Sequence, residues 1–395
     1  MADIPVPSIA TATPAAADTV VGVQGGAVKR FAVGAIKATM TDAASNTSAG
    51  KDALASISTG VQNTAVGHLA LQMNGAGNQN TAVGHAALQT ATGKDNTAVG
   101  ASALKGVTTG ENNTAVGRAA GLALTTASHN TLMGRDAAVY KQTGDKDTGI
   151  GSEVYWDAVN SGGSNTAVGY RASYHMTTAA QNTAVGAEAG YQTVGALRTT
   201  AVGYRAAFTN TANDTVAIGW ESLYLNSTGA RNTAVGYNSG AENVTGSDNV
   251  FIGWQAGLKV TGDTSVIIGS GAGGVSTAGQ NTLVGASSGQ ALTTGIKNVC
   301  IGQAAGRNLT TASECIAIGY DAQPAAGVTV NGQILLKAST TKVEVQGISI
   351  TSGTGDPESV VTATVGSLFL RTDGGAGSTL YVKETGTGNT GWAAK

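Results

Sequence analysis

Residues 80–100 read NTAVGHAALQTATGKDNTAVG, so that two copies of the motif Asn-Thr-Ala-Val-Gly stand 16 residues apart. The tetrapeptide Thr-Ala-Val-Gly or a close variant recurs sixteen times between Gly67 and Gly319, at spacings of 16, 17 or 18 residues. A degenerate further copy ends at Gly50. A fixed period of this kind is the signature of a repeat architecture, in which each repeat forms one structural unit.

The columns of the repeat, counted from the fixed glycine, alternate as a β-strand does. Position −1 is Val or Ile in nearly every copy, position −3 is Thr, Val or Ile, and position −2 is mostly Ala. Positions −3 and −1 therefore share one face of a short strand, and position −2 points to the other face. Position +3 is Ala or Ser in all sixteen copies but one, and turns rich in Thr, Gly, Asn and Asp complete each repeat and supply the backbone angles of a corner.

The length of the repeat selects the fold class. Seventeen residues of extended chain reach roughly 55 Å, enough for one small circuit, whereas helical repeats run to about 33 residues or more. The sequence therefore predicts an all-β fold, a parallel β-solenoid or β-roll with one repeat of about 17 residues per coil over residues 46–323. About seventeen coils stacked roughly 4.8 Å apart would span roughly 80 Å. The Asn that recurs at position −4 should form a hydrogen-bonded ladder of amides.

The apolar columns predict association between chains. One coil encloses little volume, and its apolar residues are mostly Ala and Val. We expect neighbouring chains to bury the −2 column and the small +3 column, which predicts a homotrimer with the solenoids wrapped about a three-fold axis. A monomeric solenoid would need more Leu and Ile in its core.

The two ends of the chain depart from the repeat. Residues 1–45 hold three of the five prolines and two apolar runs on either side of Gly25-Gly26, a pattern typical of a β-hairpin. Residues 324–395 hold five or six short apolar runs, with a turn signal at Asp373-Gly374-Gly375, and predict a small β-rich module.

Composition excludes several classes of function. The 22 Lys and Arg residues balance 24 Asp and Glu residues, so the chain lacks the basic footprint of nucleic-acid-binding proteins. No run of about 18 apolar residues is present, so we expect no membrane insertion. The two Cys cannot make a disulfide framework, and the absence of a His/Cys cluster with ligand spacing predicts no metal site and no cofactor.

The motif Asn-Thr-Ala-Val-Gly, with Ala three residues after the glycine, resembles the head repeats of trimeric autotransporter adhesins, and longer-period versions occur in bacteriophage tail fibres. The resemblance covers roughly residues 46–322. Residues 15–30 look like the virion-attachment segment of phage fibres, and residues 366–375 and 380–384 look like a C-terminal module of phage tail and fibre proteins. An autotransporter also needs a signal peptide, a coiled-coil stalk and a membrane anchor, which we do not recognise in this sequence.

The resemblance implies a structural fibre protein of a phage virion, made in the host cytoplasm, which contributes to host attachment and catalyses no reaction. Residues 1–45 would bind a tail, baseplate or neck protein, and other parts would contact a glycan or protein of the host surface. The alternatives are a bacterial or prophage-encoded trimeric adhesin acting off the virion, a polysaccharide-degrading spike and an ice-binding solenoid. The predicted attachment residues are Val20, Val21, Val23, Val28 and Phe31.

The candidate receptor contacts are aromatic. Position +1 is Tyr or Trp in six of the later coils, and two more aromatic residues belong to an irregular repeat at residues 135–165, which is either a binding bulge or a decayed copy. Exposed rings on a solenoid could stack on the sugars of a glycan. Alternatively, they pack on one another or on a neighbouring chain. The predicted contacts are Tyr170, Tyr204, Trp220, Tyr237, Trp254, Tyr320, Tyr155 and Trp156.

Residues suited to catalysis are few. A polysaccharide-cleaving spike needs two acids in a groove, and the close pairs in the middle of the solenoid are Glu153 with Asp157 and Asp145 with Asp147. A Lys separates the second pair, which indicates a solvated corner, and we expect no enzymatic activity.

The few His and Cys residues also have positions that the repeat predicts. His68 and His85 share position +1 of adjacent coils and should stack about 5 Å apart. Cys300 and Cys315 are diagonal neighbours roughly 7–8 Å apart, which disfavours a disulfide and predicts buried thiols.

Overall fold

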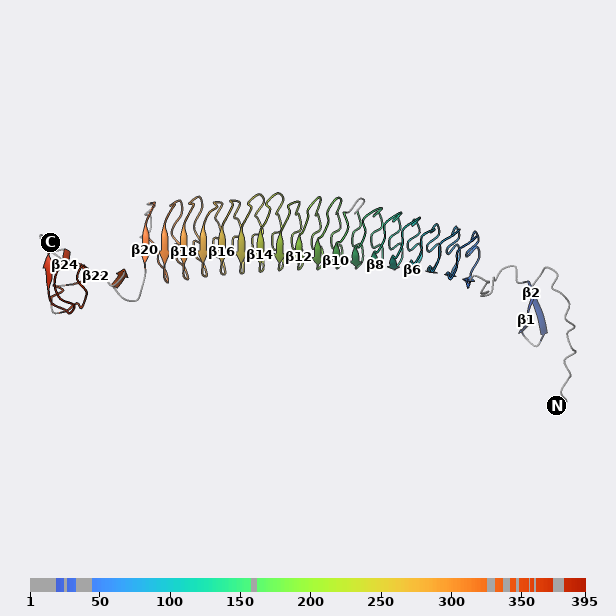
Figure 1. The fold of residues 1–395 in the computed structure, drawn as a ribbon, viewed down its shortest axis with the longest axis horizontal. Coiled ribbons are helices and arrows are strands. Elements are labelled where there is room, and N and C mark those ends of the chain that lie inside the picture. Colours follow the sequence, from blue (N-terminus) through green and yellow to red (C-terminus); the bar gives the residue numbers. More distant parts are fainter. Residues whose placement is uncertain are drawn as a thin grey trace, which may run out of the picture.

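The computed structural model of this chain describes residues 19–24, 27–32, 45–157, 162–324, 331–336, 342–345, 348–354, 356–358, 360–371 and 380–395. All regular structure in these segments is β-strand, so they contain no helix able to cross a membrane. A long row of stacked coils dominates the molecule, with a hairpin beyond one end and a small sheet beyond the other (Figure 1).

The row of coils is a parallel β-solenoid, as predicted. Eighteen three-residue strands, one per coil, pair in parallel and in chain order, and the register aligns the repeat columns. The strands are β3 (Thr47–Ala49), β4 (Thr64–Val66), β5 (Thr81–Val83), β6 (Thr97–Val99), β7 (Thr114–Val116), β8 (Thr131–Met133), β9 (Thr148–Ile150), β10 (Thr166–Val168), β11 (Thr183–Val185), β12 (Thr200–Val202), β13 (Val216–Ile218), β14 (Thr233–Val235), β15 (Val250–Ile252), β16 (Val266–Ile268), β17 (Thr282–Val284), β18 (Val299–Ile301), β19 (Ile316–Ile318) and β20 (Ile334–Leu336).

The stack extends one coil beyond the boundary predicted at residue 323. β20 lacks the Thr-Ala-Val-Gly motif, yet it pairs in register with β19. Leu335 packs against the core at the place of the −2 residue, and the Ile316 N–H donates to the Gln333 carbonyl. The motif is dispensable there because a parallel strand needs only its backbone hydrogen bonds and one inward apolar side chain.

The fixed glycine is required by the close approach of successive coils. Gly84 has a φ of +137°, and a Cβ on it would lie 2.5 Å from the Gly100 carbonyl oxygen of the next coil. Its N–H donates to the Val66 carbonyl of the preceding coil at 2.8 Å. Both the backbone angle and the lack of space exclude a side chain at this column.

The corners are built largely from residues other than glycine. Positions −5, +2 and +4 have a positive φ in nearly every coil, as at Gln62 (59°), Leu69 (60°) and Leu71 (48°). The prediction that the Thr, Gly, Asn and Asp of the turns supply these angles is right for Asp95 (59°) in the turn at residues 91–95, whereas other residue types take the −5 position in most coils. A left-handed conformation costs such a residue about 1–2 kcal/mol. Burial of the Leu71 side chain and the bond from its N–H to the Ala87 carbonyl offset that cost.

The hydrophobic core lies inside each coil. The −2 residue Ala65, the +3 residue Ala70 and the +4 residue Leu71 are all fully buried within the single chain. The expectation that neighbouring chains bury the −2 and +3 columns is therefore wrong. Strand alternation turns the −2 side chain into its own coil, and Leu at position +4 fills the space opposite, so the outward columns are −3 and −1.

Side-chain volume is matched between columns −2 and +4. Several coils combine Ala at −2 with Leu at +4, as in Ala98 and Leu104. Phe251, a large −2 residue, lies instead against Gly240 and Gly257, where a Cβ would be 2.5 Å and 2.2 Å from its ring. Such compensation allows a narrow coil to remain close-packed without a second chain.

The flanking segments form two separate β elements. β1 (Thr19–Gln24) and β2 (Ala27–Ala32) make the predicted antiparallel hairpin, which carries the candidate attachment residues. The proline-rich residues 1–18 lie outside the described segments.

The C-terminal sheet holds five strands, of which only β22 and β23 pair in parallel. Phe369, Tyr381 and Trp392 form its small core. The turn signal at Asp373-Gly374-Gly375 lies outside the described residues, but β23 and β24 on either side of it pair antiparallel. The strands are β21 (Lys342–Val345), β22 (Ile348–Gly353), β23 (Leu368–Arg371), β24 (Leu380–Lys383) and β25 (Trp392–Ala394).

Candidate binding surfaces

The outward face of the stacked strands carries a row of apolar −1 side chains beside a −3 column that is mostly Thr. We call it the strand stripe, and it consists of the −3 and −1 side chains of β3–β20. The −1 side chains are mostly Val or Ile, and most of them are exposed, as Val66 (40%) and Ile318 (42%) are. None of the stripe positions holds a charged residue. A row of exposed apolar side chains along eighteen strands far exceeds the scattered apolar residues of an ordinary surface.

Most aromatic side chains of the chain lie on a second surface. The chain has 10 Tyr, 4 Trp and 4 Phe, and the solenoid core buries only Tyr155 and Phe251. Eleven others occupy position +1, +5 or +6 of the coils from Gly134 to Gly253, and we call this surface the aromatic band. Its members are Tyr140, Trp156, Tyr170, Tyr174, Tyr191, Tyr204, Phe208, Trp220, Tyr224, Tyr237 and Trp254.

Position +5 forms a ladder of stacked rings that the sequence analysis missed. The ring centroids of Trp156, Tyr174, Tyr191 and Phe208 follow one another at 6.0, 5.0 and 4.8 Å, with interplanar angles of 4° or 5°. Tyr224 continues the ladder at 5.0 Å. Because neighbouring rings cover one another's faces, the ladder presents ring edges to solvent. The recurrence of aromatic residues at +5 in successive repeats is the signal that could have revealed it.

The predicted +1 residues form the other edge of the band. Tyr170, Trp220, Tyr237 and Trp254 are 44 to 52% exposed. Tyr204 is half-buried against Trp220, with ring centroids 4.3 Å apart. Tyr237 and Trp254 lie 6.5 Å apart and nearly parallel. These side chains are therefore accessible on the single chain.

Three predicted contacts lie apart from this edge, of which Trp156 belongs to the +5 ladder. Tyr320 is 69% exposed, but three coils with small or polar +1 residues separate it from the band. Tyr155 is fully buried, so its prediction as a receptor contact is wrong. Its ring fills space left by Gly149, where a Cβ would lie 2.9 Å from Tyr155 Cδ2, and its hydroxyl donates to the Thr148 carbonyl at 3.2 Å. In the core of the irregular coil, the Tyr155 ring thus makes up for the side chain that Gly149 lacks.

Position +2, between the two aromatic columns, carries ion pairs across adjacent coils. Arg171 Nε lies 2.8 Å from Glu153 Oε2, and Arg205 Nε lies 2.6 Å from Glu188 Oε2. Each guanidinium also lies over rings of both columns, 4.9 to 5.5 Å from their centroids. The hydrogen bonds to the carboxylates raise the pKa of both arginines, so the band holds charges that are neutralised in place.

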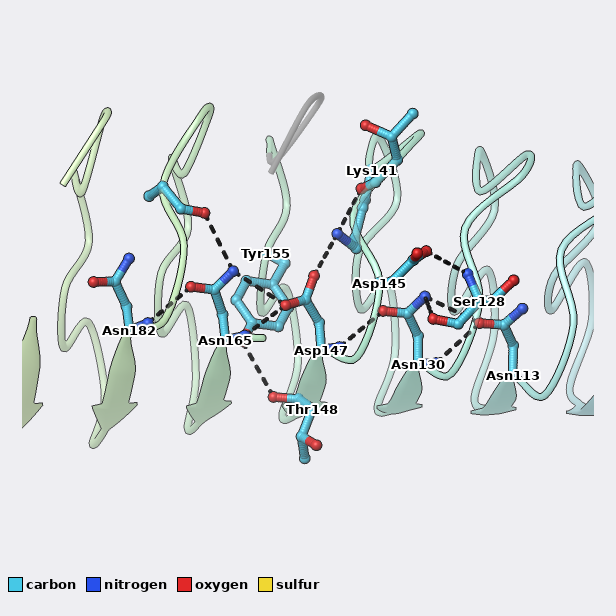
Figure 2. Close-up of polar contacts among 12 residues, drawn as sticks. Asn113, Ser128, Asn130, Lys141, Asp145, Asp147, Thr148, Tyr155, Asn165 and Asn182 are labelled. Carbon is cyan, nitrogen blue, oxygen red and sulfur yellow. Dashed lines mark hydrogen bonds and ion pairs between the residues drawn. The ribbon is translucent and has the colours of Figure 1, made fainter. Parts of the chain in front are cut away.

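A buried asparagine ladder runs along position −4, as predicted. The Asn130 backbone N–H and its Nδ2 both donate to Asn113 Oδ1 at 3.0 Å. Asp147 takes the place of one asparagine, and Figure 2 shows it between Asn130 and Asn165. The Asn165 N–H donates to Asp147 Oδ1 at 2.7 Å, so the ladder continues through the carboxylate.

The Asp147 carboxylate is paired with a lysine inside the core. Lys141 Nζ lies 2.6 Å from Asp147 Oδ2 and donates to the Thr143 carbonyl at 2.7 Å, and both charged side chains are fully buried (Figure 2). Burial lowers the pKa of Lys141, and the neighbouring Asp147 opposes that shift. The predicted solvated corner is therefore wrong for Asp147, although Asp145 is exposed and accepts a hydrogen bond from the Ser128 N–H.

The other predicted carboxylate pair, Glu153 with Asp157, is engaged by basic side chains. Glu153 lies 3.0 Å from Arg135 as well as against Arg171, and Asp157 lies 3.3 Å from His175 Nδ1. In the part of the chain that the structure describes, no three His, Cys, Asp or Glu side chains gather to hold a metal ion.

The stacking of His68 and His85 and the burial of both thiols are confirmed. The ring centroids of His68 and His85 are 5.3 Å apart. Cys300 and Cys315 are buried and form no disulfide, and burial raises the pKa of Cys300 to about 12.

Comparison of the chain with protein-family models, with curated proteins and with solved structures finds no match. The two surfaces and the solenoid that presents them are therefore the features that bear on function.

Proposed function

We propose that this chain is the structural subunit of a homotrimeric phage virion fibre, with the solenoid as its shaft, and that it contributes to host-surface attachment. The strand stripe carries this proposal. One chain leaves exposed this uncharged sheet face with its row of apolar −1 side chains, and burying apolar surface contributes about 25 cal/mol per Å². Two further copies about a three-fold axis would cover it along the whole shaft. In this proposal the −1 and −3 side chains lie at the contact between chains, where the sequence analysis placed the −2 and +3 side chains.

The ends of the chain suit attachment at one end and contact at the other. The β1–β2 hairpin has only two strands, and an isolated hairpin is marginally stable in water. It therefore needs a partner, and we propose a tail, baseplate or neck protein of the virion. Eighteen coils at roughly 4.8 Å each would hold the C-terminal sheet roughly 80 Å away. The work of such a fibre is mechanical spacing and adhesion, without catalysis.

One pair of variants tests the stripe. Val99 lies on the stripe and is 38% exposed, whereas Val194 is 45% exposed and lies outside it. Val99→Glu would place three like charges near the three-fold axis, so on size-exclusion chromatography the trimer should dissociate into single chains at a lower temperature than the wild type does. Val194→Glu is the matched control and should remain trimeric. Equal behaviour of the two variants would remove the basis of the proposal.

The place of the protein on a particle needs a separate experiment. Antibodies against residues 1–45 and against residues 324–395 can be located by cryo-electron microscopy of phage particles. We expect the first epitope at the particle and the second at the distal end. Labelling of a bacterial surface in place of a particle would support the adhesin alternative and contradict the virion assignment.

A further inference from the structure

The aromatic band lies where packing of the coils does not require it. The core is filled by residues such as Leu71 and Leu104, and other coils carry Ala101 or Gln303 at the same +1 position without any loss of the fold. The chain nevertheless exposes about half of the surface of residues such as Trp220 and Trp254. Neighbouring exposed Trp and Tyr side chains are typical of binding surfaces.

The aromatic band has two parts that differ in ring orientation, the stacked rings at position +5 and the more open rings at position +1. The +5 ladder rings cover one another, so they brace the band and offer only their edges. The +1 edge is open in places. Tyr170 has the small residues Ser152 and Ala187 at the same position of the coils before and after it, and Trp254 is followed by Ser270. These neighbours leave room beside the rings for a flat group to stack.

The charges of the band are satisfied within it. Arg205 lies against Glu188 and 3.9 Å from Glu221, and Arg171 lies against Glu153. These five +2 side chains comprise three carboxylates and two guanidinium groups, so the band has no positive excess to attract an anionic polymer. The paired groups can still exchange hydrogen bonds with hydroxyls.

We propose that the +1 edge of the band, Tyr170, Tyr204, Trp220, Tyr237 and Trp254, binds an uncharged polysaccharide that lies along the solenoid axis. Sugar rings present apolar C–H faces that pack on Tyr and Trp, and their hydroxyls can bond to the neighbouring Arg and Glu side chains. One polymer chain can contact several of these rings at once, so contacts that are individually weak together give a higher affinity. The inference rests on the proposed function only for the source of the glycan, the host surface.

The test uses the purified full chain and defined polymers. Dextran, mannan and a galactan are the uncharged probes, and polygalacturonate and hyaluronate are the acidic probes. Binding is measured by affinity electrophoresis and by tryptophan fluorescence at low and high salt. Trp220→Ala and Trp254→Ala remove rings of the edge, and Tyr320→Ala removes an exposed +1 ring outside the band as the matched control. Melting curves and the native mass of each variant are recorded alongside.

We expect at least one uncharged polymer to bind with little dependence on salt. Each Trp variant should lose roughly tenfold in affinity, with an unchanged melting temperature and mass, and Tyr320→Ala should bind as the wild type does.

Four outcomes would overturn the inference: binding of acidic polymers only, binding of no polymer, an equal loss in Tyr320→Ala, or a loss of trimer mass in the Trp variants. The last outcome would assign the rings to a contact between chains. Glycan binding by a protein that is absent from virions would contradict the proposed function and leave this inference standing.

Discussion

Replacing Phe251 by a small residue and Gly240 by a large one tests whether core columns −2 and +4 are matched by side-chain volume. Phe251 is fully buried, and a Cβ at Gly240 would lie 2.5 Å from its Cδ2 and 2.9 Å from Leu223 Cδ2. Gly240 has a φ of 58°, and Leu residues at the same +4 position adopt nearly the same angle, as Leu88 does at 47°. Leu therefore fits the backbone at position 240 once the Phe ring is removed.

The expected magnitudes follow from these contacts. Phe251→Ala leaves a cavity between two glycine-lined coils and should cost about 3–5 kcal/mol. Gly240→Leu forces atoms into the ring and should cost about 1–3 kcal/mol or more. Independent effects would sum to about 4–8 kcal/mol. In the double variant the Leu introduced at position 240 fills part of the space that the Phe ring leaves, although Gly257 stays unfilled, so this variant should be more stable than either single variant and less stable than the wild type.

Urea unfolding followed by circular dichroism provides the assay. The midpoints should fall in the order wild type, double variant and then either single variant, with similar slopes. Because a repeat protein can unfold in parts, a change of slope must be checked by hydrogen exchange in the affected coils. A double variant that is as unstable as the two single effects added together would refute volume matching between the columns.

Three further predictions concern buried or paired groups. Lys141→Leu or Asp147→Asn alone should cost about 3–5 kcal/mol, because each removes one member of a buried ion pair, whereas the double variant should melt at or above the wild-type temperature. Glu358 accepts two backbone N–H groups, which lower its pKa. A pKa lowered by folding stabilises the C-terminal sheet above the unfolded value of about 4.3 and loses that effect as pH falls through the folded value. Amide exchange in that turn, corrected for intrinsic rates, should therefore accelerate in acid, and Glu358→Gln should abolish this pH dependence. The thiol of Cys300, with a pKa of about 12, should resist iodoacetamide at pH 8 until urea unfolds the protein, as mass spectrometry would show; labelling of the folded chain would contradict its burial.

The period of the solenoid could be predicted from the sequence, but which face of its strands points into the coil could not. The spacing of the fixed glycines and the alternation around Ala65 are visible in single repeats. Which face points inward depends on Leu71, six residues further on, whose side chain fills the coil opposite Ala65. With Ala65 inside, strand alternation leaves Val66 outside. Apolar character on both faces therefore concealed which of them points inward.

The surfaces were predictable to different degrees for similar reasons. The +1 residues follow a glycine that marks the register, so Trp220 and Trp254 could be placed on one column. Tyr155 and Trp156 are adjacent and both aromatic, and only the positive φ at Tyr155 (52°) turns its ring inward. Asp147 follows a charged turn and gives the pattern of an exposed corner, whereas the asparagine ladder holds it inside with Lys141.

The coverage of the strand stripe by two further copies is tested most directly by the native mass of the purified full chain. Sedimentation equilibrium or native mass spectrometry would measure it over a range of protein concentrations. With a chain mass of 38.9 kDa, the expected species has three times that mass and persists on dilution. A single chain at every concentration, with the stripe still exposed to solvent, would contradict the trimeric fibre.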